Sequence, residues 1–324
     1  MKYKNIVVAG AGVLGSQIAF QTAYCGFNVT VLVREEDDQK AIKKRFKKLY
    51  ETYVSTIEVM GSKVGKNNGV WALGIASADD FNKRLCLKKA KRALDSIIIE
   101  TNQKAALNGA DLLIESITED IKIKNSFYQS IKDFLPDKTV IVTNSSTLLP
   151  SKMAKATGRE DKFLALHFAN SIWKNNITEI MAQSKTNDKY LKELEEFAKS
   201  INMIPLVAKE EKSGYILNSM LVPFLLSAMD LLANGVSDVE TIDKAWTLGT
   251  GSPDGPFQII DIVGLETARY IVKQYQKVPD IFDPLFKKMM LPYNYEGMLE
   301  ILDKYMAEGK TGKACGEGFY KYKK

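Results

Sequence analysis

The chain has 324 residues, of which 45% are hydrophobic and 26% charged, and its formal net charge is +6. This composition excludes a disordered or low-complexity chain, and the length predicts two domains. The mild positive charge suits an anionic small ligand, although scattered lysines explain it equally well. No nucleic-acid motif accompanies the charge, so no nucleic-acid partner is expected.

The first 35 residues predict a strand, a glycine turn, a helix and a second strand. Residues 6–9 are a short β-branched run that leads directly into glycines, so no signal peptide is expected. The glycine turn at residues 10–15 is followed by helical spacing at residues 16–24, and Gly26 ends this helix. Residues 29–33 form the second apolar strand.

Further apolar runs predict the rest of a sheet. Strands are expected at residues 112–114, 139–143, 163–166, 177–181 and 203–208, with a helix at about 188–200. Continuous apolar strands separated by helical stretches indicate an α/β fold, with a doubly wound parallel sheet covered on both faces. Residues 40–108 are rich in lysine and mostly helical in pattern, and they are expected to be a helical elaboration of this half.

The character of the sequence changes at residue 209. Strand patterns end there, and helices are predicted at residues 215–233, 239–247, 265–276 and 297–306. The predicted domains are therefore an α/β domain at residues 1–208 and an all-helical domain at residues 209–324. The apolar stretch 215–233 contains Asn218, Pro223 and Asp230, so a buried helix is expected in place of a membrane span.

Three cysteines are present, Cys25, Cys86 and Cys315, and none has C-x-x-C spacing. An odd number without this spacing predicts neither a disulfide framework nor a metal site. It fits a protein of the reducing cytoplasm.

The glycine turn matches the G-x-G-x-x-G fingerprint of dinucleotide-binding proteins, because it follows a strand and opens a helix. Gly10 permits the tight turn, Gly12 lets the backbone approach a pyrophosphate, and Gly15 allows close packing of helix and strand. The helix N-terminus offers free N–H groups to the phosphates. A Rossmann-type domain is therefore predicted, with a cofactor contact at Gly10, Gly12, Val13, Leu14 and Gly15.

The end of the second strand bears on the choice between NAD and NADP. An NAD enzyme usually places a carboxylate there to hold the ribose hydroxyls. Val33 occupies the expected position and Arg34 follows, and an arginine can bind a 2′-phosphate. Glu35 and Glu36 come next and could restore an NAD-type contact. NAD and NADP both remain open, with NADP favoured slightly.

His167 is the single histidine of the chain, at the end of the apolar run 163–166. Side chains at the carboxyl ends of strands face the ligand crevice of an open α/β sheet. Ser146 lies in a run of hydroxyl residues at the end of the preceding strand, and Glu179 lies on the next strand pattern. A carboxylate there would orient the imidazole and favour its protonated form. These residues predict an acid/base centre at the sheet edge.

Several motifs resemble the 3-hydroxyacyl-CoA dehydrogenase family. They are residues 143–146 (TNSS), 166–170 (LHFAN), 178–181 (TEIM), 214–218 (GYILN) and the terminal 316–320 (GEGFY). The segments 144–151 (NSSTLLPS), 167–170 (HFAN) and 249–257 (GTGSPDGPF) resemble the diketoreductase-type members. The resemblance covers nearly the whole chain.

The resemblance implies roles for individual residues. His167 would exchange the hydroxyl proton, Glu179 would pair with it, and Ser146 and Asn218 would hydrogen-bond the substrate oxygen. Two of these residues also have a purely structural interpretation. Ser146 could cap a helix, and Asn218 could be a buried polar side chain of its helix. Beyond the glycine turn, cofactor contacts are implied for Arg34, Glu119, Lys124, Asn144 and Asn170.

The chain also departs from the family. Members commonly read H-F-F-N-P, whereas this chain reads His167-Phe168-Ala169-Asn170-Ser171, so the substrate loop differs. The lysine that precedes the terminal motif in the family has no clean counterpart, because Ala314 stands there. The basic cluster at residues 43–48 could attract the phosphates of CoA, but a solvated helix face is the preferred interpretation.

The function implied is NAD(P)-dependent interconversion of L-3-hydroxyacyl and 3-ketoacyl groups, as in fatty acid metabolism. The substrate is a small molecule, either a CoA thioester or a free β-keto acid or ester. A gulonate-type dehydrogenase and a crystallin-like nucleotide-binding protein also remain open. A homodimer is expected, because residues 215–233 are more apolar all round than a helix with one solvent face.

Overall fold

The computed structural model describes residues 2–63, 65, 71–276 and 293–322. The chain forms two compact units, Met1–Ile216 and Leu217–Lys324. The boundary expected from sequence, after residue 208, coincides with the end of the last strand. Residues 209–216 continue to contact the first unit, where Tyr215 and Ile216 hydrogen-bond to Ser145 and Glu179.

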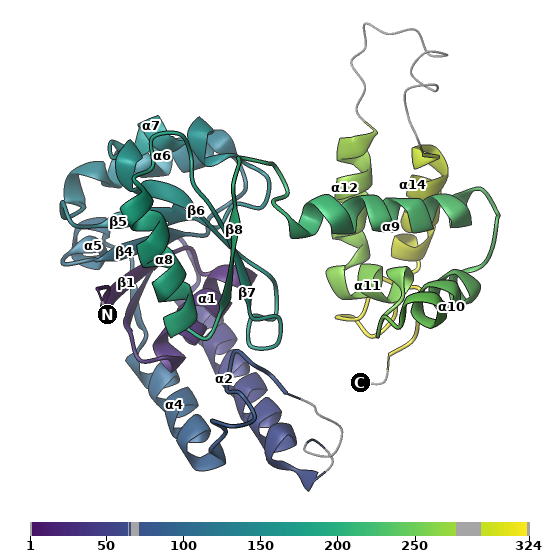
Figure 1. The fold of residues 1–324 in the computed structure, drawn as a ribbon, viewed down its shortest axis with the longest axis horizontal. Coiled ribbons are helices and arrows are strands. Elements are labelled where there is room, and N and C mark those ends of the chain that lie inside the picture. Colours follow the sequence, from purple (N-terminus) through teal and green to yellow (C-terminus); the bar gives the residue numbers. More distant parts are fainter. Residues whose placement is uncertain (1, 64, 66–70, 277–292, 323–324) are drawn as a thin grey trace, which may run out of the picture. The chain divides into compact units, whose positions relative to one another are not determined.

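The first unit is built on a sheet in the order β3-β2-β1-β4-β5-β6-β7-β8. Figure 1 labels β1 and the strands from β4 to β8. The strands from β3 to β6 are parallel, β7 is antiparallel to β6, and β8 is parallel to β7. The order 3-2-1-4-5-6 is that of a dinucleotide-binding doubly wound sheet, and the predicted fold class is confirmed. The strands are β1 (Asn5–Ala9), β2 (Asn28–Leu32), β3 (Ile98–Glu100), β4 (Leu112–Glu115), β5 (Val140–Thr143), β6 (Phe163–Phe168), β7 (Ile177–Met181) and β8 (Ile204–Ala208).

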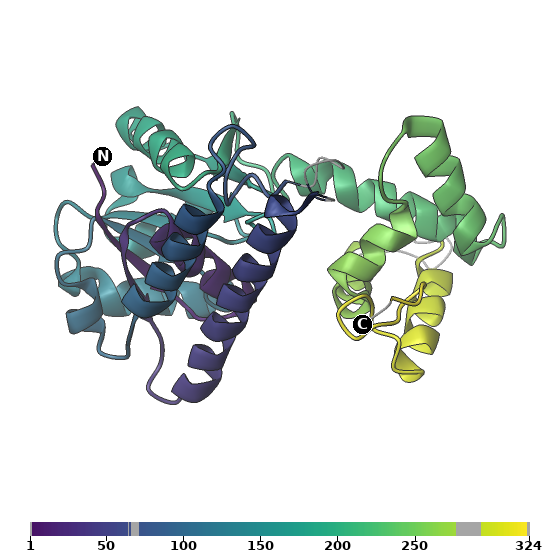
Figure 2. The same ribbon diagram turned by 90° about the horizontal axis from the view of Figure 1, so that it is seen from below.

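Helices cover both faces of this sheet, as Figure 2 shows from below. On β1, Ile6 and Val8 point into one hydrophobic cluster, and Val7 and Ala9 point into the other. This alternation is the period of two of a strand buried on both sides. One face packs against α1 (Val13–Tyr24), α2 (Gln39–Gly61), α4 (Lys83–Ser96) and α8 (Asp188–Ser200), and the other packs against α5 (Gln103–Leu107), α6 (Ile121–Ile131) and α7 (Ala154–Thr157).

The segment 40–108 corrects the prediction that it is a helical elaboration only. Its helices α2 and α4 pack on each other and on α1, but it also contains β3, which pairs with β2 at the edge of the sheet. This strand has three residues, and Ile98 on it is exposed. A strand this short carries too little alternation to be read from sequence.

The glycine turn has the geometry that the fingerprint requires. Gly10 has φ +100°, and a Cβ there would lie 2.4 Å from the Ser116 carbonyl oxygen. A Cβ on Gly15 would lie 2.3 Å from the Gly10 oxygen, so the helix can approach the turn only without one. A Cβ on Gly12 would meet no atom within 4 Å. The backbone at Gly12 is therefore open on the side where a ligand can approach.

The second unit is helical in the residues described. Its helices are α9 (Leu217–Ala233), α10 (Val239–Thr250), α11 (Pro256–Val263), α12 (Leu265–Tyr275) and α14 (Tyr295–Ala307), of which α11 was not expected. The terminal GEGFY segment is hydrogen-bonded to α11. Asp261 on this helix accepts hydrogen bonds from the N–H groups of Phe319 and Tyr320. None of the helices described is long and apolar enough to span a membrane.

Candidate active site

His167 and Glu179 are direct neighbours on the antiparallel strands β6 and β7. Opposed residues of such a pair place their side chains on the same face of the sheet. Glu179 Oε2 lies 3.0 Å from His167 Nδ1. Glu179 is 2% exposed and His167 is 6% exposed, so this contact is largely shielded from water. An ionised carboxylate can only accept a hydrogen bond, so a neutral imidazole in this arrangement carries its hydrogen on Nδ1 and presents the lone pair of Nε2.

Ser146 lies on the other side of the imidazole. Its Oγ is 3.2 Å from His167 Nε2. Glu179 is itself held in place, because its Oε1 accepts a hydrogen bond of 2.9 Å from the backbone N–H of Ile216. The carboxylate, the imidazole and the hydroxyl thus form one connected row. A substrate hydroxyl that approaches Nε2 would also meet the Ser146 hydroxyl.

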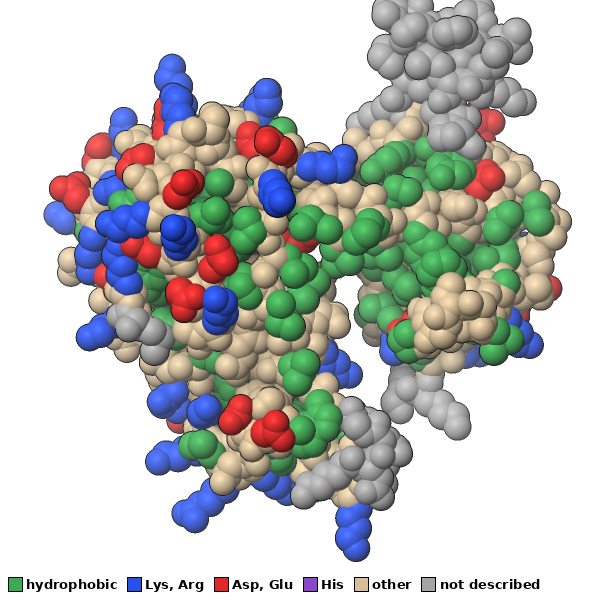
Figure 3. All heavy atoms as spheres, viewed as in Figure 1, with side chains coloured by type: hydrophobic (Ala, Val, Ile, Leu, Met, Phe, Trp, Pro, Cys, Tyr) green, Lys and Arg blue, Asp and Glu red, His purple; other side chains and the backbone are tan. Residues whose placement is uncertain are grey.

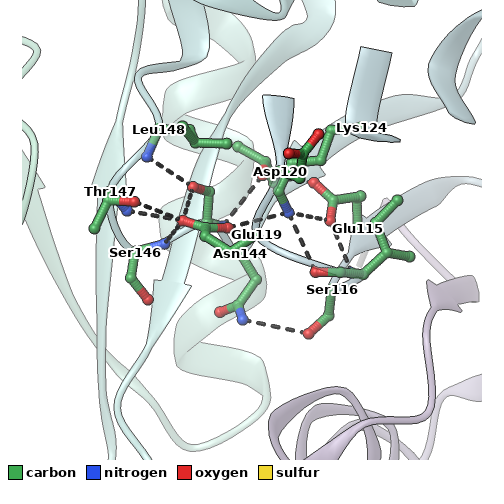
Figure 4. Close-up of polar contacts among 12 residues, drawn as sticks. Glu115, Ser116, Glu119, Asp120, Lys124, Asn144, Ser146, Thr147 and Leu148 are labelled. Carbon is green, nitrogen blue, oxygen red and sulfur yellow. Dashed lines mark hydrogen bonds and ion pairs between the residues drawn. The ribbon is translucent and has the colours of Figure 1, made fainter. Parts of the chain in front are cut away.

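The position of Ser146 is fixed by Glu119 (Figure 4). We call residues 144–148 the serine loop. Glu119 Oε1 accepts from the backbone N–H groups of Ser146 and Thr147, and from the Ser145 hydroxyl at 2.5 Å. Burial raises the pKa of the Glu119 carboxyl, but hydrogen bonds from Ser145 and Thr147 and the charge of Lys124 lower it, and the net pKa lies below its ordinary value. An ionised Glu119 therefore holds the loop at neutral pH.

Beneath Glu119 lies a buried ionic network that the sequence did not predict. Lys124 Nζ is 2.5 Å from Glu115 Oε1 and 3.3 Å from Glu119 Oε2, and its side chain is 1% exposed. Glu115, at the end of β4, also accepts from the hydroxyls of Tyr128 and Thr143. Burial and the neighbouring Glu115 raise the pKa of Tyr128 well above its ordinary value, so its hydroxyl stays a donor.

The predicted asparagines have different surroundings. Asn144 bridges two strand ends, because its Oδ1 accepts from the Phe168 N–H at 3.0 Å and its Nδ2 donates to Ser116 Oγ at 3.4 Å. Asn170 is exposed, and its carbonyl accepts from Asn175 Nδ2. Asn218 lies in the first turn of α9, in the second unit. A contact between Asn218 and the substrate oxygen therefore stays a prediction.

A pocket of about 1270 Å³ lies over the glycine turn and the end of β2. Gly12 is the N-cap of helix α1 and offers no side-chain cap, whereas α5 and α6 are capped by Asn102 and Asp120. The first N–H groups of α1 are thus left for a phosphate. With the open backbone at Gly12, the pocket fits a dinucleotide. Of the predicted cofactor residues, the pocket is lined by Gly10, Gly12 and Arg34 and not by Val13, Leu14, Gly15, Glu119, Lys124, Asn144 or Asn170.

The end of β2 corrects one step of the cofactor argument. Val33 lies in the hydrophobic core and is 5% exposed, so its side chain is not the one that would clasp a ribose. Arg34 is the first residue after the strand with an exposed side chain at the pocket. Its guanidinium pairs with Asp37 at 2.9 Å and with Glu36 at 3.2 Å.

Sequence reasoning also missed contacts around the loop that follows His167. Gln17 on α1 is buried, and its Oε1 accepts from the N–H groups of Ser171 and Ile172. Ser171 has φ +58°, a conformation closed to the proline that the family commonly carries there, and proline would also lack the N–H. The sequence offered one signal for this contact: Gln17 is a polar residue on the helix face that was predicted to be apolar.

The comparisons with known proteins agree across the chain. Residues 5–211 match the NAD binding domain of 3-hydroxyacyl-CoA dehydrogenase, and residues 214–322 match its C-terminal domain. The human mitochondrial hydroxyacyl-coenzyme A dehydrogenase is 32% identical over 320 residues, which cover 99% of this chain and 91% of that protein. A 3-hydroxybutyryl-CoA dehydrogenase of Mycobacterium tuberculosis is 29% identical over 98% of both chains. A solved diketoreductase structure, described for dual catalysis of dicarbonyl compounds, is 41% identical with a TM-score of 0.81, covering 99% of this chain and 100% of that one.

Proposed function

The chain belongs to the 3-hydroxyacyl-CoA dehydrogenase family, NAD-binding oxidoreductases that act on CH–OH groups, and from this premise we propose how its own residues do so. The proposed reaction is the reversible oxidation of an L-3-hydroxyacyl group to a 3-ketoacyl group. The observation that carries it is the row Glu179–His167–Ser146, with Nε2 aimed at a hydroxyl.

In the oxidation direction, His167 Nε2 takes the proton of the substrate hydroxyl. The imidazolium that forms keeps its Nδ1–H on Glu179, which balances the charge inside a buried site. Ser146 donates a hydrogen bond to the same oxygen as negative charge develops there. In the reduction direction, the proton returns from Nε2 to the oxygen.

The nicotinamide cofactor supplies the hydride acceptor or donor when it is bound. We propose that Gly10, Gly12 and the free N–H groups of α1 hold its phosphates. Glu119 and Lys124 are proposed to act through the serine loop instead of touching the cofactor directly, because Lys124 is buried and neither residue lines the pocket.

A turnover assay tests this function. The full chain should oxidise NADH or NADPH with acetoacetyl-CoA, and the product should be the L-3-hydroxy stereoisomer. The measurement is the loss of cofactor absorbance, followed by chiral analysis of the product. The absence of turnover with any 3-keto substrate, by protein that binds the cofactor, would overturn the proposal.

A second candidate is reduction of dicarbonyl compounds that carry no CoA. It is favoured by the loop after His167, where Ser171 replaces the proline common in the family and bonds through its N–H to Gln17. Parallel kcat/KM measurements on acetoacetyl-CoA and a simple β-keto ester separate the candidates. A higher value for the ester would assign the chain to the dicarbonyl reaction.

NAD is the cofactor of the family, and a modest preference for NADPH is our proposal for this chain. Arg34 offers a guanidinium to a 2′-phosphate, but Glu36 and Asp37 compete for it. Arg34→Asp should shift the ratio of kcat/KM for NADPH and NADH toward NADH by roughly tenfold, the factor of one charge-assisted hydrogen bond. An unchanged ratio, or a wild-type preference for NADH, would contradict this proposal.

Arg45 on α2 provides the matched control. It lines the same pocket and donates to the Ala11 carbonyl in the glycine turn, and no ion pair of Arg45 is found in the described part of the chain. A cation beside this turn would bind the pyrophosphate that both cofactors share. Arg45→Gln should therefore weaken the binding of NADH and NADPH equally, measured as Kd by nicotinamide fluorescence.

We also propose a homodimer formed through the second unit. Figure 3 shows hydrophobic side chains gathered on this unit. Of the residues of α9, only Leu226, Ala228 and Met229 are buried, and Met220 is 63% exposed. Light scattering at micromolar concentration should give twice the 36.2 kDa chain mass. Met220→Glu should produce monomer, whereas Ile98→Glu at an exposed position of the first unit should not. A monomeric wild type would refute the proposal.

A further inference from the structure

One face of the catalytic imidazole is covered by Tyr215, a residue to which the reaction above gives no role. The rings of Tyr215 and His167 are stacked, with centroids 4.7 Å apart and planes at 18°. Tyr215 is 1% exposed. Its hydroxyl donates a hydrogen bond of 2.8 Å to the carbonyl oxygen of Ser145, next to Ser146. Tyr215 thus contacts both the base and the serine loop.

The backbone around Tyr215 is unusual. Gly214 has φ +80°, and Tyr215 itself has φ +52°. A bulky residue in this left-handed region costs of order 1–3 kcal/mol and persists only where its surroundings hold it. This conformation also explains why α9 begins at Leu217 and not at residue 215, where the apolar pattern placed its start.

The next residue contacts the third member of the row. The Ile216 N–H donates to Glu179 Oε1 at 2.9 Å. Two successive residues therefore contact Ser145, His167 and Glu179. Because these contacts come from one short segment, the orientation of the three groups is set together.

We propose that Tyr215 is a positioning residue: its ring fixes the plane of the His167 imidazole, and its hydroxyl fixes the serine loop that carries Ser146. An aromatic face also stabilises the cation that the imidazole becomes when it takes the substrate proton. This inference rests on the proposed function, because it assigns Tyr215 to the acid/base step. A phenylalanine at this position would keep the ring and lose the hydroxyl.

Two substitutions separate the two parts of this role. Tyr215→Leu removes both the ring and the hydroxyl. Its kcat should fall roughly tenfold to a hundredfold, the cost of a misplaced catalytic group, with the KM for the cofactor unchanged. Tyr215→Phe keeps the stacked ring, and we expect its kcat to fall about threefold to tenfold through the serine loop alone. Tyr24→Phe is the control, a buried tyrosine whose hydroxyl bonds to Ile75. Its kcat should be unchanged.

The single histidine makes a second measurement unambiguous. In ¹⁵N-labelled protein, long-range ¹H–¹⁵N spectra contain one imidazole, that of His167. The wild type, Tyr215→Phe and Tyr24→Phe should show the tautomer with hydrogen on Nδ1. In Tyr215→Leu the imidazole can turn away from Glu179, so the spectrum should show averaging of the two tautomers. This readout needs neither substrate nor turnover, so it decides the inference even if the proposed reaction fails.

Two results would overturn the proposal. One is a Tyr215→Leu variant with the wild-type imidazole spectrum and a kcat within about twofold of wild type. The other is the same spectral change in Tyr24→Phe, which would show that general loosening of the unit, and not the stacked ring, is the cause.

Discussion

His167→Gln should lower kcat by about 10²–10⁴-fold, the usual contribution of general acid–base catalysis. Glutamine fills much of the same space beside Tyr215 and can still donate to Glu179, but it cannot take the proton of a substrate hydroxyl. Because His167 is the only histidine of the chain, no second imidazole can substitute for it.

The measurement is kcat with saturating cofactor and substrate, together with the cofactor Kd and the thermal unfolding of each protein. The Kd should be unchanged, because His167 does not line the dinucleotide pocket. Tyr24→Phe again serves as a control for packing changes in the first unit. A fall in kcat of less than about tenfold with an unchanged Kd would show that another group moves the proton.

The contact between His167 and Glu179 could be predicted from the sequence, but the strand geometry that produces it could not. His167 and Glu179 each stand on an apolar strand, so a common sheet edge could be predicted. Their direct opposition depends on β7 running antiparallel to β6, which no local pattern reports. Hydrophobic spacing predicts Tyr215 as the first residue of a buried helix, because the positive φ of Tyr215 follows from tertiary contacts and leaves no trace in that spacing.

For the cofactor residues, too, the sequence predicts what local sterics require but not what depends on tertiary contacts. Gly10 and Gly15 could be predicted, because glycine is required by steric contacts within one turn. Val33 and Arg34 are adjacent and both line the pocket, but Val33 packs into the core whereas Arg34 is exposed, and the pattern alone does not show at which residue the strand ends. Lysine is usually found at the surface, so the sequence predicts Lys124 to be exposed. The structure shows why it is buried: it pairs with Glu115, which is itself buried at the end of β4.

Lys124→Met should lower the free energy of unfolding by about 3–5 kcal/mol, the typical cost of removing one partner of a buried ion pair. Glu115 is fully buried, and Tyr128 and Thr143 would be left to satisfy it without a cation. The matched control is Lys138→Met. Its Nζ is also 2.5 Å from a carboxylate, that of Asp111, but its side chain is 55% exposed. An exposed pair of this kind contributes less than about 1 kcal/mol.

The double variant Glu115→Gln/Lys124→Met distinguishes an unpaired charge from a packing defect. Removing both charges leaves no buried ion, so most of the lost stability should return, whereas a packing defect at Lys124 would persist. Both variants also remove the charge 3.3 Å from Glu119 Oε2, so each should loosen the serine loop and lower kcat even where the protein is folded. Equilibrium unfolding in urea and kcat at low temperature measure the two effects separately. If Lys124→Met were as mild as Lys138→Met in both stability and kcat, the buried network would not be what anchors Glu119.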